Sequence, residues 1–200
     1  MLARIALAAL SSLTLASSAA ARDGPIQGLH ADGPYRPQAA QMMAAFGRLI
    51  GDWDLVIEHR QEDGSWQRTT GEWHFGWILQ GRAIQDVWIA YRPGVARSAP
   101  DALLGYGTTI RVYDAGADRW HVNWMGVLNH NYTLFTARVE GAEIVMEATD
   151  DDGHPFQWIF SEISESGFRW RAQTSTDNRA TWTVAQRMTA GRSAGDRGKE

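Results

Sequence analysis

Two charged residues lie between the first and last tryptophans of an aromatic-rich stretch of the chain, GEWHFGWILQGRAIQDVW (residues 71–88). Arg82 and Asp86 are close together in it, between Trp73 and Trp88. A carboxylate held among aromatic rings can act as a general acid or base. A guanidinium group can hold a carboxylate or phosphate through two parallel hydrogen bonds. Both kinds of chemistry require the side chain to face inward.

The turn residues in this stretch predict how it folds back on itself. Gln80 and Gly81 favour a two-residue hairpin loop, so we expect Leu79 to pair with Arg82. The resulting pairs are Trp77 with Ile84, Phe75 with Asp86, and Trp73 with Trp88. Because side chains alternate along a strand, the aromatic rings then share one face with Arg82 and Asp86. We expect this face to be inward, since it holds the large rings.

The next hairpin adds a third charged residue to an aromatic face. It is expected to pair Tyr113 with Trp120, Arg111 with Val122, and Thr109 with Trp124. Arg111 would therefore lie on the same face as two tryptophans.

A fourth charged residue, Glu162, ends an alternating aromatic row. The row and its expected partner strand contain Phe156, Trp158, Phe160, Phe168, Trp170 and Ala172. A buried charge without a partner costs several kcal/mol, so inward charges must pair or neutralise. The four charged residues either form internal ion pairs in a filled interior or line a cavity that holds a small molecule.

The elements that would position these residues are antiparallel strands. From Gly51 onward, alternation interrupted by turn residues every eight to twelve positions predicts ten strands. We place them near 52–60, 65–78, 82–92, 104–113, 120–126, 132–139, 143–149, 155–163, 168–175 and 181–188. Alanine and methionine at helical spacing predict one short helix within residues 37–50.

The number and order of the predicted strands favour a closed barrel. Ten strands in series must leave two exposed edges or close, and closure removes the edges. We therefore predict an all-β protein, an antiparallel up-and-down β-barrel of about ten strands preceded by one short helix. A β-sandwich is the alternative, although only residues 93–103 are long enough for a crossover connection.

The order of these motifs resembles a known group of barrels. A helix leading into GDWDLVI is similar to the Gly-x-Trp that opens the first strand of calycins, here Gly51 and Trp53. Together with GEWHFGWILQGRAIQDVW, YGTTIRVYD and FRWRAQTSTD, it resembles uncharacterised bacterial lipocalin-like domains of unknown function. The resemblance implies a barrel. It also implies a basic residue packed on Trp53: Arg187 by position, or Arg192, since alternation turns Arg187 away from Val184.

The beginning of the chain has the features of a secretory signal peptide. Arg4 precedes an apolar run, and small residues at 19–21 form a cleavage site. The run is about a dozen residues, whereas a bilayer-spanning helix needs roughly 20, so no membrane span is expected. We predict a signal peptide at 1–21, a flexible segment at 22–36, one barrel domain at 37–190 and a disordered tail at 191–200. The protein would be periplasmic or secreted.

Composition and motifs argue against several function classes. The 19 basic and 23 acidic residues are dispersed, which disfavours nucleic-acid binding. The chain has no cysteine, and neither His121 nor His130 has zinc-site spacing, so no metal or cofactor is expected. The segment STDNRATW (175–182) resembles the Asp-box of sialidases, a motif whose usual role is to stabilise a tight turn.

The leading prediction is an exported protein that binds a small apolar or amphipathic molecule. Aromatic rings would hold its apolar part, and Arg82 with Arg111 would receive an anionic end. The candidate binding residues are Trp73, Phe75, Trp77, Arg82, Asp86, Trp88, Arg111, Trp124, Trp158, Glu162 and Trp170. One alternative is a cofactor-free enzyme with Asp86 or Glu162 as general acid or base. Another is a structural or interaction barrel without a ligand.

Overall fold

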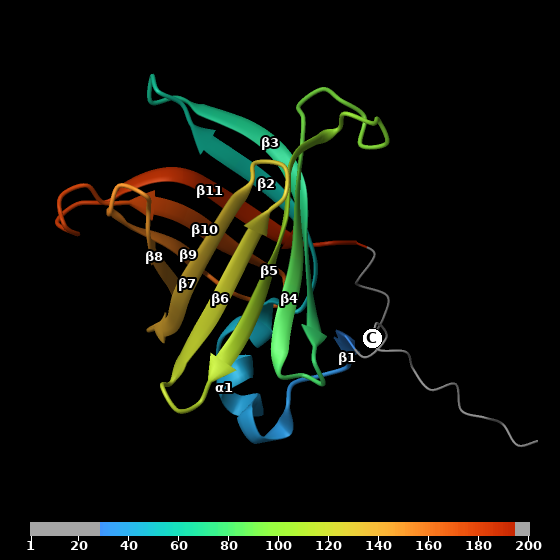
Figure 1. The fold of residues 1–200 in the computed structure, drawn as a ribbon. Coiled ribbons are helices and arrows are strands. Elements are labelled where there is room, and N and C mark those ends of the chain that lie inside the picture. Colours follow the sequence, from blue (N-terminus) through green and yellow to red (C-terminus); the bar gives the residue numbers. More distant parts are fainter. Residues whose placement is uncertain (1–28, 195–200) are drawn as a thin grey trace, which may run out of the picture.

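The chain forms a closed antiparallel barrel. The computed structural model describes residues 29–194. Ten strands pair in the order in which they follow one another, and the last, β11, pairs with β2 to complete the circle (Figure 1). The strands are β2 (Gly51–Arg60), β3 (Trp66–Ile78), β4 (Ala83–Tyr91), β5 (Leu103–Asp114), β6 (Arg119–Gly126), β7 (Asn131–Glu140), β8 (Glu143–Thr149), β9 (Pro155–Ser161), β10 (Gly167–Thr174) and β11 (Thr183–Arg192). The predicted ten-strand up-and-down barrel is confirmed.

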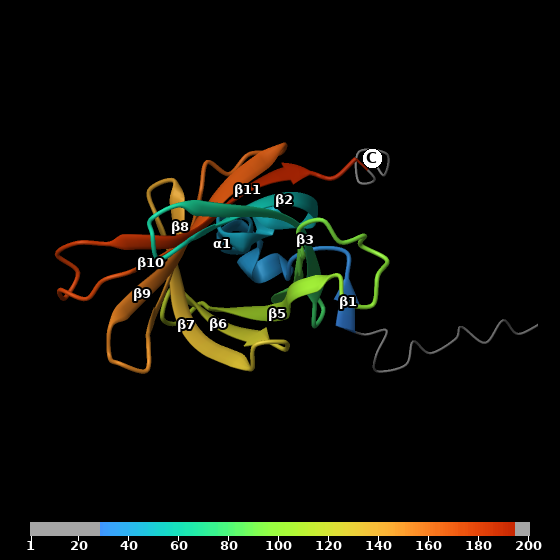
Figure 2. The same cartoon turned by 90° about the horizontal axis from the view of Figure 1, so that it is seen from above.

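Short helical elements cover one end of the barrel. They are η2 (Arg36–Gln38), α1 (Ala39–Ala44) and η3 (Phe46–Leu49), as the sequence predicted for this region. Seen from above, the strands surround α1 (Figure 2). Met42, Phe46 and Leu49 are fully buried, and the Phe46 ring centroid lies 5.1 Å from that of Trp120. The helical segment therefore plugs the barrel with apolar side chains. None of the helices in residues 29–194 is long and apolar enough to cross a membrane.

The first-strand tryptophan is fixed at this plugged end. Trp53 is fully buried, and its Nε1 donates a hydrogen bond of 2.7 Å to the carbonyl oxygen of Leu49. The guanidinium carbon of Arg192 lies 3.7 Å from the Trp53 ring centroid, and Arg192 Nη1 donates to the Ile50 carbonyl oxygen at 2.8 Å. Arg192 is thus the basic residue on Trp53.

Arg187, the match by position, lies elsewhere. It is exposed on the outer wall, where its guanidinium carbon is 4.2 Å from the Trp66 ring centroid and its Nε donates to Glu58. The physical reason is the alternation of β11, which turns Arg187 and Glu58 outward as a cross-strand pair.

The predicted domain limits fall partly within the described residues. β11 continues to Arg192, beyond the limit of 190 drawn from the sequence. A two-residue strand, β1 (His30–Ala31), pairs with the end of β3, inside the segment predicted to be flexible. The predicted signal peptide lies outside the described residues.

The predicted registers of two hairpins are confirmed. Trp73 pairs with Trp88, Phe75 with Asp86, and Trp77 with Ile84. Arg111 pairs with Val122 and Thr109 with Trp124. These registers carry the aromatic rings of neighbouring strands to the same level inside the barrel.

Candidate ligand-binding site

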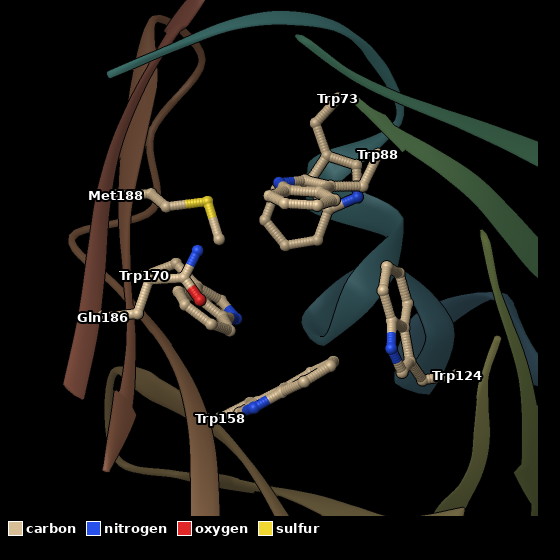
Figure 3. A pocket seen from close by; sticks show the side chains of 7 residues that line it. All are labelled: Trp73, Trp88, Trp124, Trp158, Trp170, Gln186 and Met188. Carbon is tan, nitrogen blue, oxygen red and sulfur yellow. The ribbon is translucent and has the colours of Figure 1, made fainter. Parts of the chain in front are cut away.

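Five tryptophans from five strands surround a cavity inside the barrel. We call it the tryptophan cavity; its lining residues are Trp73, Trp88, Trp124, Trp158, Trp170, Gln186 and Met188 (Figure 3). The rings form an unbroken series of edge-to-face contacts. Ring centroids are 6.0 Å apart for Trp88–Trp124, 5.5 Å for Trp124–Trp158, 5.4 Å for Trp158–Trp170 and 6.2 Å for Trp170–Trp73. The free volume is about 60 Å³.

Two glycines on β5 make room for this series. A Cβ added to Gly105 would lie 2.6 Å from Trp88 Cζ3, and one added to Gly107 would lie 2.7 Å from Trp124 Cζ2. Any side chain at these inward positions would displace an indole. The sequence LLGYGT therefore gives β5 a bare wall, over which the rings of its two neighbouring strands lie.

The cavity lies toward the barrel end that the helices do not cover. Trp73 and Trp170 are each 3% exposed, whereas Trp88, Trp124 and Trp158 are only half-buried. On the plugged side, the Trp73 ring centroid is 5.1 Å from that of Phe75 and 5.3 Å from that of Phe160. Solvent thus reaches the site past the three half-buried rings.

The polar atoms of the cavity wall are mainly hydrogen-bond donors. Nε1 of Trp73, Trp88 and Trp170 and Nε2 of Gln186 are buried and make no hydrogen bond. No titratable side chain occurs among the described residues that line the cavity. The wall therefore offers unpaired N–H groups in an aromatic surrounding.

Asp86 and Arg111 face inward as predicted and form an ion pair with each other. Both are 1% exposed, and Arg111 Nη1 donates to Asp86 Oδ2. Asp86 Oδ1 accepts a second hydrogen bond from the backbone N–H of Thr109 at 3.2 Å. The guanidinium carbon lies 4.8 Å from the ring centroid of Phe46, so the pair sits between the tryptophan cavity and the plug.

The inward placement predicted for Arg82 is wrong. Pairing of β3 and β4 ends at Ile78 and Ala83, and a longer loop replaces the expected two-residue turn. Leu79 and Gln80 have φ values of 52° and 57°, which take the chain out of the alternating ladder. Arg82 is exposed, and its guanidinium carbon lies 3.9 Å from the ring centroid of Tyr35.

Glu162 is also outside the barrel, contrary to the prediction. β9 ends at Ser161, and Glu162 follows with a φ of 51°, so alternation no longer determines its direction. Its side chain is 69% exposed and accepts a hydrogen bond of 2.8 Å from Arg169 Nε.

The remaining predicted residues divide between lining and core. Six tryptophans were predicted to bind the ligand, and all of them except Trp77 line the cavity. Phe75 and Trp77 are buried in the core instead. Sequence reasoning missed Gln186 and Met188, although alternation from Val184 along the last strand would have placed both inward.

The segment resembling an Asp-box is a tightly bonded turn. Asp177 Oδ1 accepts hydrogen bonds from the Ser175 hydroxyl and the Thr181 backbone N–H, each of 2.8 Å. The Thr181 hydroxyl donates to Asp177 Oδ2 at 2.6 Å. These bonds lower the pKa of Asp177 to about 2, and the bond from the Thr181 hydroxyl contributes most to the shift. Within residues 29–194, no cluster of His, Asp and Glu side chains suits a metal ion.

Comparison with known proteins bears on the fold. No protein-family model and no curated protein matches the chain. The S-type phycobiliprotein lyase CPES from Guillardia theta is similar in structure, with a TM-score of 0.50 at 10% identity, over 74% of this chain and 90% of that one. Two redesigned β-barrels are more distant. One, b11L5F_LGL, has a TM-score of 0.40 at 14% identity, over 75% of this chain and 96% of that one. The other, mFAP0 bound to DFHBI, has a TM-score of 0.38 at 16% identity, over 72% of this chain and 99% of that one. The likeness to the lyase supports the barrel fold.

Proposed function

We propose that this is an exported protein that binds one small, mainly apolar aromatic molecule in the tryptophan cavity. The observation that carries the proposal is the unbroken series of five indole rings around that cavity. Binding pockets for small molecules are typically concave, aromatic-lined and supplied with a few polar groups. Export rests on the signal peptide predicted from residues 1–21.

The cavity is too small for a ring-sized ligand unless its walls move. A free volume of about 60 Å³ is well below the roughly 300–1,000 Å³ typical of small-molecule pockets. A ring-sized ligand therefore requires the indoles to move apart. Trp88, Trp124 and Trp158 are the rings that move, because they are half-buried and have solvent on one side.

The charges of the barrel favour a neutral ligand. Arg82 is on the surface, and Arg111 is already bound to Asp86, so the anionic end expected from the sequence has no free guanidinium group beside the cavity. The same arrangement favours binding over acid–base catalysis. Asp86 is held by Arg111, and Glu162 is outside the barrel.

A thermal-shift and calorimetric titration with naphthalene tests the proposal. A ligand that binds only the folded state at 100 times its Kd stabilises it by about 2.7 kcal/mol, so the melting temperature should rise by several degrees. Native mass spectrometry of protein purified from the organism that makes it should show one small neutral adduct per chain. Absence of both the shift and the adduct would favour an interaction barrel instead.

A further inference from the structure

We infer that the ligand of the tryptophan cavity is a planar carbonyl compound that accepts hydrogen bonds at two of its edges, such as a quinone. The inference rests on the proposed function and specifies its ligand class. Its basis is the surplus of unpaired donors: Nε1 of Trp73, Trp88 and Trp170, and Nε2 of Gln186.

These donors belong to two separate walls of the cavity. Trp73 and Trp88 are a directly opposed cross-strand pair on β3 and β4. Gln186 on β11 pairs with Ala172, so it is the diagonal neighbour of Trp170 on β10. Figure 3 shows the two tryptophans of the first wall together and the Gln186 amide beside Trp170 in the second. A ligand between the walls meets N–H groups at two edges.

The closed packing leaves these donors without acceptors. An indole N–H has a fixed direction on a rigid ring, and burying it unpaired costs free energy. In the closed state the wall exposes mainly carbon to the free volume, so the rings must separate before the donors are available. A ligand that carries oxygen acceptors then both separates the rings and satisfies the donors.

The polar groups that line the cavity also disfavour other classes of ligand. Among the described lining residues, the one side-chain oxygen acceptor is the Gln186 carbonyl, so a ligand rich in donors would leave its own groups unpaired. No cation lines the cavity to compensate a carboxylate. A neutral acceptor with a flat apolar body fits both restrictions.

Three probes with the same fused rings separate these possibilities: para-naphthoquinone, naphthalene and naphthoate. They differ in acceptors and charge but little in the apolar area that they bury. The chain contains no cysteine, so thiol addition to the quinone cannot occur. Two satisfied donors should make naphthoquinone bind at least about tenfold tighter than naphthalene in calorimetry, since each net hydrogen bond contributes roughly a fivefold change.

Two variants separate the donors from the apolar wall. Gln186→Met removes the amide with little change in volume, so it should weaken naphthoquinone binding about fivefold while leaving naphthalene affinity within twofold, because one net hydrogen bond is lost. Trp170→Phe removes the indole N–H together with part of a wall ring, so it should weaken the binding of both ligands, and that of naphthoquinone about fivefold more. Gln67→Met makes the same amide deletion at an exposed position of β3 and should change neither affinity. Melting temperatures show that each variant is folded.

The outcomes separate the inference from the function on which it rests. If none of the three probes binds the wild-type protein, the proposed function fails and the inference fails with it. If naphthalene or naphthoate binds as tightly as naphthoquinone, the function stands and the carbonyl inference is overturned. Equal weakening of naphthalene and naphthoquinone by Gln186→Met would also overturn it, because a change of cavity shape would then explain the effect.

Discussion

Gly107 on β5 lies beneath the indole ring of Trp124 on β6, so closely that an added Cβ would be 2.7 Å from Trp124 Cζ2. A residue with no side chain thus determines where a wall of the tryptophan cavity stands.

Gly107→Ala should push both the Trp124 ring and the Met125 carbonyl oxygen away from β5 and reduce ligand binding. Overpacking of this kind costs about 1–3 kcal/mol in stability, which urea unfolding would measure. Because the displaced ring moves toward the cavity, we expect affinity for naphthalene or naphthoquinone to fall by about tenfold or more. Gly76→Ala is the matched control, since an added Cβ there meets no atom within 4 Å. Unchanged affinity in Gly107→Ala would show that Trp124 does not bound the binding site.

The buried ion pair should behave as a unit. Asp86→Ala leaves Arg111 buried and unpaired, and we expect a loss of about 3–5 kcal/mol in free energy of unfolding. Asp86→Leu combined with Arg111→Met removes both charges and should recover most of that loss, because apolar replacements of buried pairs are often neutral.

The exposed pair of Arg169 and Glu162 provides the comparison for the buried one. Glu162→Ala should cost less than about 1 kcal/mol, since exposed ion pairs contribute little. A double variant at 86 and 111 that is as unstable as Asp86→Ala alone would contradict the expectation that the two charges act as a unit.

Arg192 should stabilise the plugged end more than Arg187 stabilises the outer wall. Arg192→Ala removes both a cation–π contact with buried Trp53 and a hydrogen bond to the Ile50 carbonyl oxygen. We expect its cost to be about 1–2 kcal/mol above that of Arg187→Ala, whose contacts are exposed. Trp53→Ala itself should cost roughly 3–5 kcal/mol. Equal urea-unfolding results for the two arginine variants would mean that Arg192 does not close the barrel.

The turn at residues 175–182 should make stability depend on acid pH. Its hydrogen bonds lower the folded-state pKa of Asp177 from 3.8 to about 2. Because the folded pKa is the lower one, the carboxylate contributes its stability above pH 3.8 and loses it as the pH falls through about 2. The stability difference between wild type and Asp177→Asn should therefore shrink across that window in urea unfolding. A difference that stays constant with pH would contradict the lowered pKa.

Alternation allowed much of this interior to be predicted from the sequence. Within a paired ladder the side-chain period is fixed, so the inward placement of Trp73, Trp88 and Asp86 followed from one hairpin register. Alternation failed to predict the directions of Arg82 and Glu162. In both cases a left-handed φ at or next to a strand end takes the residue out of the alternating ladder. Sequence patterns do not show such backbone changes.

Other features of the site depended on three-dimensional packing. Alternation could have placed Gln186 and Met188 inward, but they are neither aromatic nor charged, so nothing in their types marked them as lining residues. The surplus of unpaired indole N–H groups is a property of how the rings pack, and composition alone does not reveal it. The free volume likewise follows from where Gly105 and Gly107 let the indoles lie.

The most direct test is to observe the indole N–H groups themselves while a ligand binds. In a two-dimensional proton–nitrogen spectrum, each tryptophan gives a separate side-chain signal. On titration with para-naphthoquinone, the expected result is a shift of the signals of Trp73, Trp88, Trp124, Trp158 and Trp170. The signals of Trp53, bonded to Leu49 at the plugged end, and of Trp66, on the outer wall, should stay in place. A titration that moves Trp66 and leaves the five lining indoles unchanged would place the ligand outside the barrel and contradict the proposed site.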